Sequence, residues 1–170
     1  IGVHTAWQDG TPMLLLVGQV ASDQRDREAF QELDYRQFFG PGTLGMAKWA
    51  AEVHDADRLP EYVARAFRVA MQGRPGPVVL ALPEDMLTGL NAAPVLARVE
   101  PARAVPDATS IACARDMLAR AQRPLVVAGG GFDADGARAL QAFAHAWGLP
   151  VTCAFRWQDT LDNDDAHYAG

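Results

Sequence analysis

Three consecutive glycines follow an apolar stretch and precede a helical pattern: Gly129, Gly130 and Gly131. With Ala134 they have the spacing G-x-G-x-x-A, and a helix that begins there offers free N–H groups and a positive dipole end to a phosphate. Asp133 and Asp135 fall in the same first turn, where their carboxylates compete for those N–H groups and repel an anion. A nucleotide site and a plain strand-to-helix turn therefore both stay open.

The other candidates for chemistry are histidines, serines and a pair of carboxylates. The histidines are scattered, without an i, i+4 pair and without a carboxylate at ligand spacing: His4, His54, His145 and His167. We therefore expect no metal site. Ser22 and Ser110 lack the motif of a nucleophile elbow. Glu84 and Asp85 follow an expected strand, where carboxylates are more often solvated than bound to a substrate.

The elements that must position these residues alternate between strands and helices. Residues 13–17 and 78–82 are short continuous apolar runs, typical of strands buried on both faces of a parallel sheet. The pattern of residues 60–71 predicts a helix with one apolar face, made of Val63, Phe67, Ala70 and Met71. Because ligands gather beyond the carboxyl ends of parallel strands, the loop from Gly18 to Glu32 is the first place to look for a site, and the site region is expected to extend to Lys48.

A proline-rich stretch, residues 87–107, has no steady period and indicates a stiff linker. A second alternation follows, with strands expected at 124–128 and 150–154. The first helix of this part is expected to be capped by Ser110 and to turn these residues inward: Ile111, Met117, Leu118 and Ala121. The second is expected to begin at Asp133 and to share one face among Ala137, Leu140, Ala144 and Trp147.

These patterns predict an α/β fold in which parallel sheets are flanked by helices. The chain is expected to hold parts of two Rossmann-like or flavodoxin-like domains, residues 1–86 and residues 108–170, joined by the linker. Because it begins at Ile1 and not at Met, we expect it to be a segment of a longer polypeptide.

The amino-acid composition indicates which partners and which cellular compartment to expect. Hydrophobic residues make up 49% of the 170 residues, the formal net charge is −6 and the sequence pI is about 5.1. This acidic balance argues against nucleic acid or an anionic membrane as a partner. Cys113 and Cys153 lie in apolar surroundings without metal or disulfide spacing, so we expect buried free thiols and a cytoplasmic protein.

Several stretches occur in a distinctive order: Gly10-Thr11-Pro12, Gly18-Gln19-Val20, Ala29-Phe30-Gln31-Glu32, Ala47-Lys48-Trp49, Arg74-Pro75-Gly76-Pro77 and Pro83-Glu84-Asp85. In this combination they resemble the acetolactate-synthase-like family of thiamine-diphosphate enzymes. Residues 123–131 and 167–170 resemble the central domain of that family. The resemblance implies that residues 1–86 are the C-terminal half of the pyrimidine-binding domain and that residues 108–170 open the central domain.

The resemblance also implies a site. Phe30 and Gln31 match residues that line the channel to the thiazolium of the cofactor, Gln19 ends the strand beside them, and Lys48 matches a basic position near the channel. Between Phe30 and Lys48 the chain is a few residues longer than the family pattern, through residues 42–45. The glycine turn resembles a region that holds FAD in some members and ADP or no nucleotide in others, and Asp133 with Asp135 argues against FAD here.

For the whole protein, the resemblance implies thiamine diphosphate and Mg²⁺ as cofactors and a homodimer or tetramer. It implies a lyase or transferase that decarboxylates or ligates 2-oxo acids. The family's catalytic Glu and its Gly-Asp-Gly motif for Mg²⁺ are not in this stretch, so we expect no catalytic residue here and no activity from these residues alone. The alternatives are a non-catalytic nucleotide-binding module on the same scaffold and an NAD-type dehydrogenase.

Overall fold

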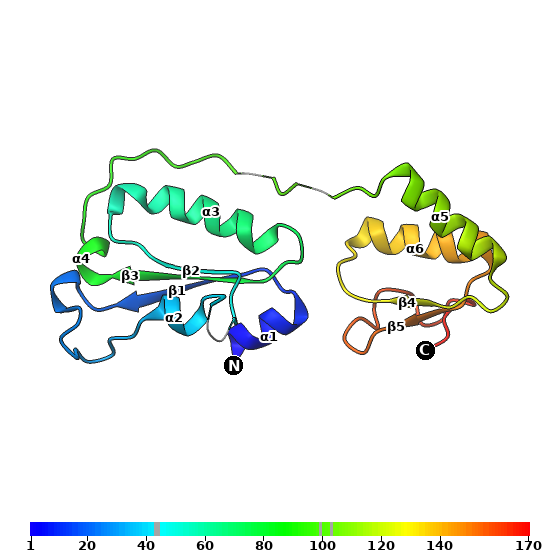
Figure 1. The fold of residues 1–170 in the computed structure, drawn as a ribbon, viewed down its shortest axis with the longest axis horizontal. Coiled ribbons are helices and arrows are strands. Elements are labelled where there is room, and N and C mark those ends of the chain that lie inside the picture. The colour runs from blue at the N-terminus through cyan, green and yellow to red at the C-terminus, as the bar shows by residue number, and fades with distance from the viewer. Residues whose placement is uncertain (43–44, 99, 103) are drawn as a thin grey trace. The chain divides into compact units, whose positions relative to one another are not determined.

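The computed structural model describes residues 1–42, 45–98, 100–102 and 104–170 (Figure 1). The chain divides into two compact units, Ile1–Ala104 and Val105–Gly170. This division lies within the stretch 87–107 that the sequence marks as a linker. Each unit is described below by itself.

The first unit is a parallel three-stranded sheet between helices. Its strands, in the order β1-β3-β2, are β1 (Met13–Gln19), β3 (Pro77–Pro83) and β2 (Trp49–Glu52). Its helices are α1 (Gly2–Asp9), α2 (Tyr35–Phe39), α3 (Leu59–Met71) and α4 (Glu84–Leu87), with short 3₁₀ turns at Ser22–Gln24 and Ala56–Arg58. Helix α3 covers one face of the sheet, and α1 and α2 lie on the other side (Figure 1).

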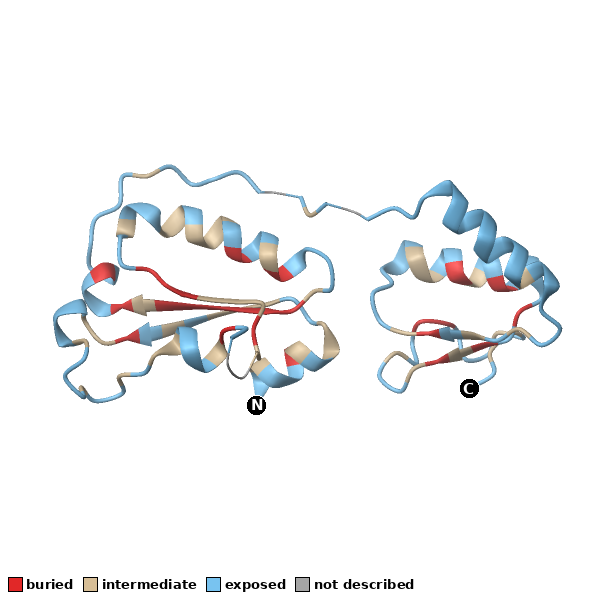
Figure 2. Ribbon diagram, in the orientation of Figure 1, coloured by how far each residue is buried: buried red, intermediate tan, exposed pale blue. Residues whose placement is uncertain are grey.

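The middle strand, β3, forms the core of this unit. Residues 77–81 are buried, as the red segment of Figure 2 shows, and Leu80 is completely inaccessible to solvent. Leu80 lies beside Leu16 of β1 and Ala51 of β2 in the sheet. Ala66 and Ala70 of α3 pack on the face of the sheet that this helix covers, and their small side chains let the helix approach the strands closely. The expected strands and the parallel α/β fold are confirmed.

Two expectations about this unit are wrong in detail. Strand β1 lies at the edge of the sheet, so Leu16 is 54% exposed and the strand is not buried on both faces. In α3, Phe67 and Met71 are also exposed. Ala66 and Ala70 face the sheet, so Phe67, one residue and 100° further round the helix, points away from it.

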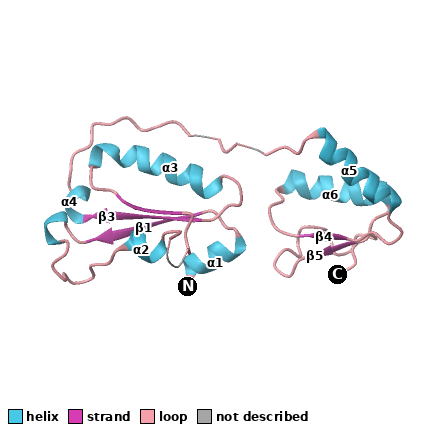
Figure 3. Cartoon of the chain, viewed as in Figure 1, coloured by secondary structure: helices cyan, strands magenta, loops and turns pink. Residues whose placement is uncertain are grey.

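The second unit contains α5 (Ala108–Arg120), β4 (Val126–Ala128), α6 (Ala134–Trp147) and β5 (Val151–Cys153). The two strands pair in parallel, and α6 packs on them (Figure 3). The core of the unit consists of Ala128, Leu140, Ala144, Val151, Cys153 and Leu161. The α/β alternation expected after the linker is therefore present.

The surroundings of α5 differ from the expectation. Asp107 caps the helix by accepting a hydrogen bond from the Ser110 N–H at 2.9 Å, whereas Ser110 lies inside the first turn. Of the four residues expected to face inward, only Leu118 is half-buried. The other three are exposed: Ile111, Met117 and Ala121. Cys113 is also exposed, because it lies on this uncovered helix, while Cys153 is buried in β5, and both thiols are free.

Trp147, expected on the buried face of α6, is 38% exposed because it lies in the last turn, beyond the strands. None of the described helices has the length and apolarity that a membrane crossing requires.

Candidate functional site

Two polar side chains meet at the carboxyl end of the first sheet. Gln19 is the last residue of β1 and Glu52 the last residue of β2, and both are at most 5% exposed. The Gln19 Nε2 atom donates to Glu52 Oε2 at 3.2 Å and to the carbonyl oxygen of Leu33 at 2.7 Å. Its Oε1 atom accepts from the Val20 N–H at 3.0 Å. Gln19 therefore joins both outer strands to the loop that follows β1.

Arg25 extends this network into the loop. Its guanidinium lies 3.5 Å from Glu52 Oε2 and 3.4 Å from Glu32 Oε1. A carboxylate as buried as that of Glu52 requires such a partner, because an unpaired charge is strongly disfavoured away from water. Among the described residues, Glu52 Oε1 has no hydrogen-bond partner. Gln19, Arg25, Glu32 and Glu52 are called the anchor network below.

The loop between β1 and α2 has an unusual backbone. Asp26, Glu28 and Gln31 have φ angles of 61°, 56° and 66°, in the left-handed region that residues other than glycine rarely adopt. The Glu32 carboxylate accepts hydrogen bonds from the N–H groups of Asp26, at 2.7 Å, and Ala29, at 3.2 Å. The bond from Asp26 contributes most to holding the pKa of Glu32 below its ordinary value. Strain of this kind persists only where its surroundings impose it, and it is concentrated at functional sites.

This loop presents Phe30 and Gln31 to solvent. Phe30 is 88% exposed, and Gln31 is exposed as well. An aromatic ring held outward by a strained, anchored loop at the carboxyl end of parallel strands is suited to contact a ligand or a further protein surface. Phe30 and Gln31 thus lie on the exposed part of the loop, whereas Gln19 is buried at the end of β1 within the anchor network. Their role in a cofactor channel stays a prediction.

The start of the same loop is tied to α4. Asp85 Oδ1 accepts from the N–H of Ser22 at 3.0 Å and from its hydroxyl at 3.2 Å. These two bonds keep the pKa of Asp85 below its ordinary value. Asp85 therefore holds the loop, while Glu84 is exposed.

Lys48 lies at the opposite end of the sheet from Gln19. It precedes β2, its N–H donates to the carbonyl of Pro77 at 2.8 Å, and its Nζ donates to the carbonyl of Gln72 at 2.5 Å. Burial lowers the pKa of its amine. Because Gln19 ends β1 and Lys48 precedes β2 in a parallel sheet, the structure does not bring the two together. Thr43 and Leu44, in the longer stretch expected at 42–45, lie outside the described residues.

Within the glycine turn of the second unit, Gly130 is closely packed, whereas Gly129 and Gly131 have open space around them. A Cβ atom on Gly130 would lie 2.3 Å from the Trp157 ring, and Gly131 has a φ of 104°. Asp133 caps α6 by accepting from the Gly136 N–H at 2.8 Å. The carboxylate therefore uses a first-turn N–H, as the sequence suggested, and a nucleotide role for Gly129, Gly130 and Gly131 stays a prediction.

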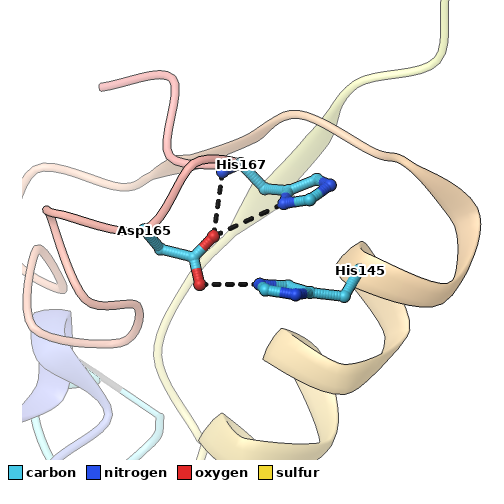
Figure 4. A group of neighbouring side chains, drawn as sticks. All are labelled: His145, Asp165 and His167. Carbon is cyan, nitrogen blue, oxygen red and sulfur yellow. Dashed lines mark hydrogen bonds and ion pairs between the residues drawn. The ribbon is translucent and has the colours of Figure 1, made fainter.

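The expectation that the histidines are scattered is wrong for two of them. His145 and His167 lie together around Asp165, because the loop that carries Asp165 and His167 folds back against the end of α6 (Figure 4). Residues 145 and 165 are twenty positions apart, so no local spacing reveals the cluster.

Comparisons with known proteins match a family model to the second unit and full-length relatives to nearly the whole chain. Residues 111–170 match the family described as thiamine pyrophosphate enzyme, central domain. The chain is 34% identical to the acetolactate synthase isozyme 2 large subunit of Escherichia coli, over 99% of this chain and 30% of the relative. It is 32% identical to the glyoxylate carboligase of Escherichia coli O157:H7, over 99% of this chain and 28% of the relative.

A solved structure from Mycobacterium smegmatis, of an enzyme assigned to the thiamin diphosphate-dependent class, superposes with a TM-score of 0.82 and 28% identity. That match covers 99% of this chain and 32% of the other. The chain thus spans about a third or less of the proteins it matches. Together these findings show that residues 111–170 match the central domain of thiamine pyrophosphate enzymes and that the chain is homologous to part of the acetolactate-synthase-like enzymes.

Proposed function

We propose that the whole protein is a thiamine-diphosphate-dependent enzyme that decarboxylates or ligates 2-oxo acids, as a lyase or a transferase. The observation that carries this proposal is the anchored loop: the anchor network holds a strained segment that exposes Phe30 and Gln31 at the carboxyl end of the sheet. Such a fixed, outward-facing pair of side chains is suited to form one side of a cofactor-binding site whose remaining residues come from other parts of the protein. The relatives named above support the choice of cofactor.

In this proposal the chain contributes orientation and exclusion of water. The chemistry that thiamine diphosphate supplies when bound is a nucleophilic carbon for the carbonyl group of the substrate. The Phe30 ring forms an apolar wall beside the reacting groups, which strengthens nearby electrostatic interactions by displacing water. The Gln31 amide both donates and accepts hydrogen bonds, so it can orient the carbonyl or carboxylate of a 2-oxo acid. Gln19, Arg25, Glu32 and Glu52 are positioning residues.

The remaining parts of the proposal concern assembly and surroundings. We propose Mg²⁺ as the second cofactor and a homodimer or tetramer as the assembly. The exposed apolar ring of Phe30 on the loop supports the view that a further protein surface contacts this unit. We also propose a cytoplasmic location, supported by the two free thiols. FAD forms no part of the proposal, because Asp133 already accepts from a first-turn N–H of α6 and the Trp157 ring packs against Gly130.

The test is an assay of the full-length protein with Mg²⁺ and a panel of 2-oxo acids, including pyruvate and glyoxylate, with and without thiamine diphosphate. We expect release of CO₂ that depends on thiamine diphosphate, and analysis of the products distinguishes an aldehyde from a condensed hydroxy acid. The absence of such release, together with stoichiometric binding of NAD(H), would favour a dehydrogenase instead.

A further inference from the structure

Two histidines and an aspartate from separate segments converge in the second unit. His145 lies in the last turn of α6, and Asp165 and His167 lie in the loop that leads toward the end of the chain (Figure 4). One ligand atom from each residue can be chosen so that the three atoms lie within 4.8 Å of one another. This cluster is separate from the anchor network, which belongs to the first unit.

Asp165 is at the centre of the cluster. Its side chain is 4% exposed, and its Oδ2 atom accepts from Gln141 Nε2 and pairs with His145 Nε2, both at 2.8 Å. Its Oδ1 atom accepts from the N–H of His167 at 2.8 Å. The Gln141 amide, followed by the His167 N–H, holds the pKa of Asp165 far below its ordinary value. The contacts with Gln141, His145 and the His167 N–H fix the carboxylate in place.

The hydrogen bonds of the cluster leave one buried ring nitrogen of His167 without a partner in the described part of the chain. Its Nδ1 atom is buried and has no hydrogen-bond partner among the described residues, since Asp165 Oδ1 is 3.5 Å away. A buried ring nitrogen without a partner is disfavoured, and native structures contain few such groups. The imidazole rings of His145 and His167 lie 4.5 Å apart between centroids. An ion bound at this cluster would give the His167 Nδ1 atom a partner.

The surroundings also favour a cation. His145 belongs to the last turn of a 14-residue helix, where the helix dipole gives a negative potential. The His145 side chain is 51% exposed, so an ion has access from solvent. Donor atoms around a tetrahedral zinc ion lie about 3.3 Å apart. An ion would replace the His145–Asp165 hydrogen bond, so the two atoms that it joins would move apart from 2.8 Å, and the separations of up to 4.8 Å within the cluster would shorten. The half-exposed His145 side chain is the member with most room to adjust.

We propose that His145 Nε2, Asp165 and His167 Nδ1 bind a divalent transition-metal ion of the zinc type, with water as the remaining ligand. Two imidazoles and one carboxylate suit zinc, whereas Mg²⁺ prefers oxygen ligands alone. Gln141 then orients the metal-binding carboxylate through its hydrogen bond. The ion ties the end of α6 to the loop of Asp165, and this structural role is independent of the thiamine-diphosphate chemistry.

The test is a titration of the tag-free full-length protein with Zn²⁺ in competition with a chromophoric chelator. Cys113 is replaced by Ser throughout, because an exposed thiol also binds zinc. We expect one zinc ion per chain to bind at this cluster, and His145→Gln to weaken that affinity by at least about 100-fold, since loss of an outer partner alone costs roughly 10–100-fold. Gln keeps a donor for Asp165 and His145 is half exposed, so this variant is expected to fold, which circular dichroism checks.

His4→Gln is the matched control, because His4 is an exposed histidine of the first unit. It should leave zinc affinity unchanged. Titration with Co²⁺ gives a second readout: its visible absorption should appear in the control and be lost in His145→Gln. Failure to bind zinc at one equivalent, or equal affinity in His145→Gln and His4→Gln, would overturn the proposal.

Discussion

Replacing Phe30 by Ala in the full-length enzyme should reduce kcat by about 100-fold, the size of effect that misplaced reacting groups produce, while leaving the thermal stability nearly unchanged. The reason is that Phe30 is 88% exposed, so its ring contributes little to the core of its unit. Its proposed role is to face the bound cofactor and exclude water there. Steady-state kinetics and a thermal melt measure the two effects on the same sample.

The chain offers a matched control for this substitution. Phe155 is 90% exposed and belongs to the second unit, so Phe155→Ala removes an equally exposed ring that is not part of the anchored loop. We expect Phe155→Ala to keep at least half of the activity, as is common for surface substitutions away from a site. If Phe30→Ala turned over as fast as Phe155→Ala, Phe30 would have no place in the site.

The second large effect concerns the strand that supports the site. Leu80→Ala should lower the free energy of unfolding by about 2–5 kcal/mol, the usual result of truncating a fully buried leucine. Leu80 is 0% exposed and lies in the middle strand under α3. Denaturation by urea, followed by tryptophan fluorescence, measures the loss. Trp49 is a suitable reporter because it stacks on Tyr62, 5.8 Å away between ring centroids, in the same core.

Leu16→Ala is the control for Leu80→Ala. Leu16 is paired with Leu80 in the register of β1 and β3, but it lies on the edge strand and is 54% exposed. The same substitution there should cost about 1 kcal/mol or less. Equal losses at the two positions would mean that β3 is not the central strand.

The strands of the first sheet were predictable because of their composition and their borders. Residues 78–82 are apolar throughout, and Gly76 and Pro83 limit the run on either side. Strand β2 was not predicted, because Trp49–Glu52 contains two alanines and a glutamate and forms a strand only by pairing with β3. The buried face of α3 was misassigned for a related reason. Large apolar side chains dominate a periodicity argument, whereas the close contact is made by Ala66 and Ala70.

The resemblance assigned four residues to a cofactor channel, and that assignment stays a prediction: Gln19, Phe30, Gln31 and Lys48. In the structure, Phe30 and Gln31 are exposed on the loop, Gln19 is buried at the end of β1, and Lys48 lies at the other end of the sheet. The resemblance did not identify Arg25 and Glu52, whose pairing depends on how the loop folds back on β2. One signal was available: Glu52 is a charged residue between Ala51 and Val53, and a charge within an apolar strand requires a partner.

Hydrogen–deuterium exchange of the full-length enzyme, with and without thiamine diphosphate and Mg²⁺, tests the central claim that the anchored loop faces the cofactor. The account predicts that the cofactor slows exchange in residues 20–34, whereas residues 134–147 in the second unit exchange at the same rate. Calorimetry on the same sample establishes that the cofactor is bound. Unchanged exchange in residues 20–34 of a protein that has bound thiamine diphosphate would contradict the account.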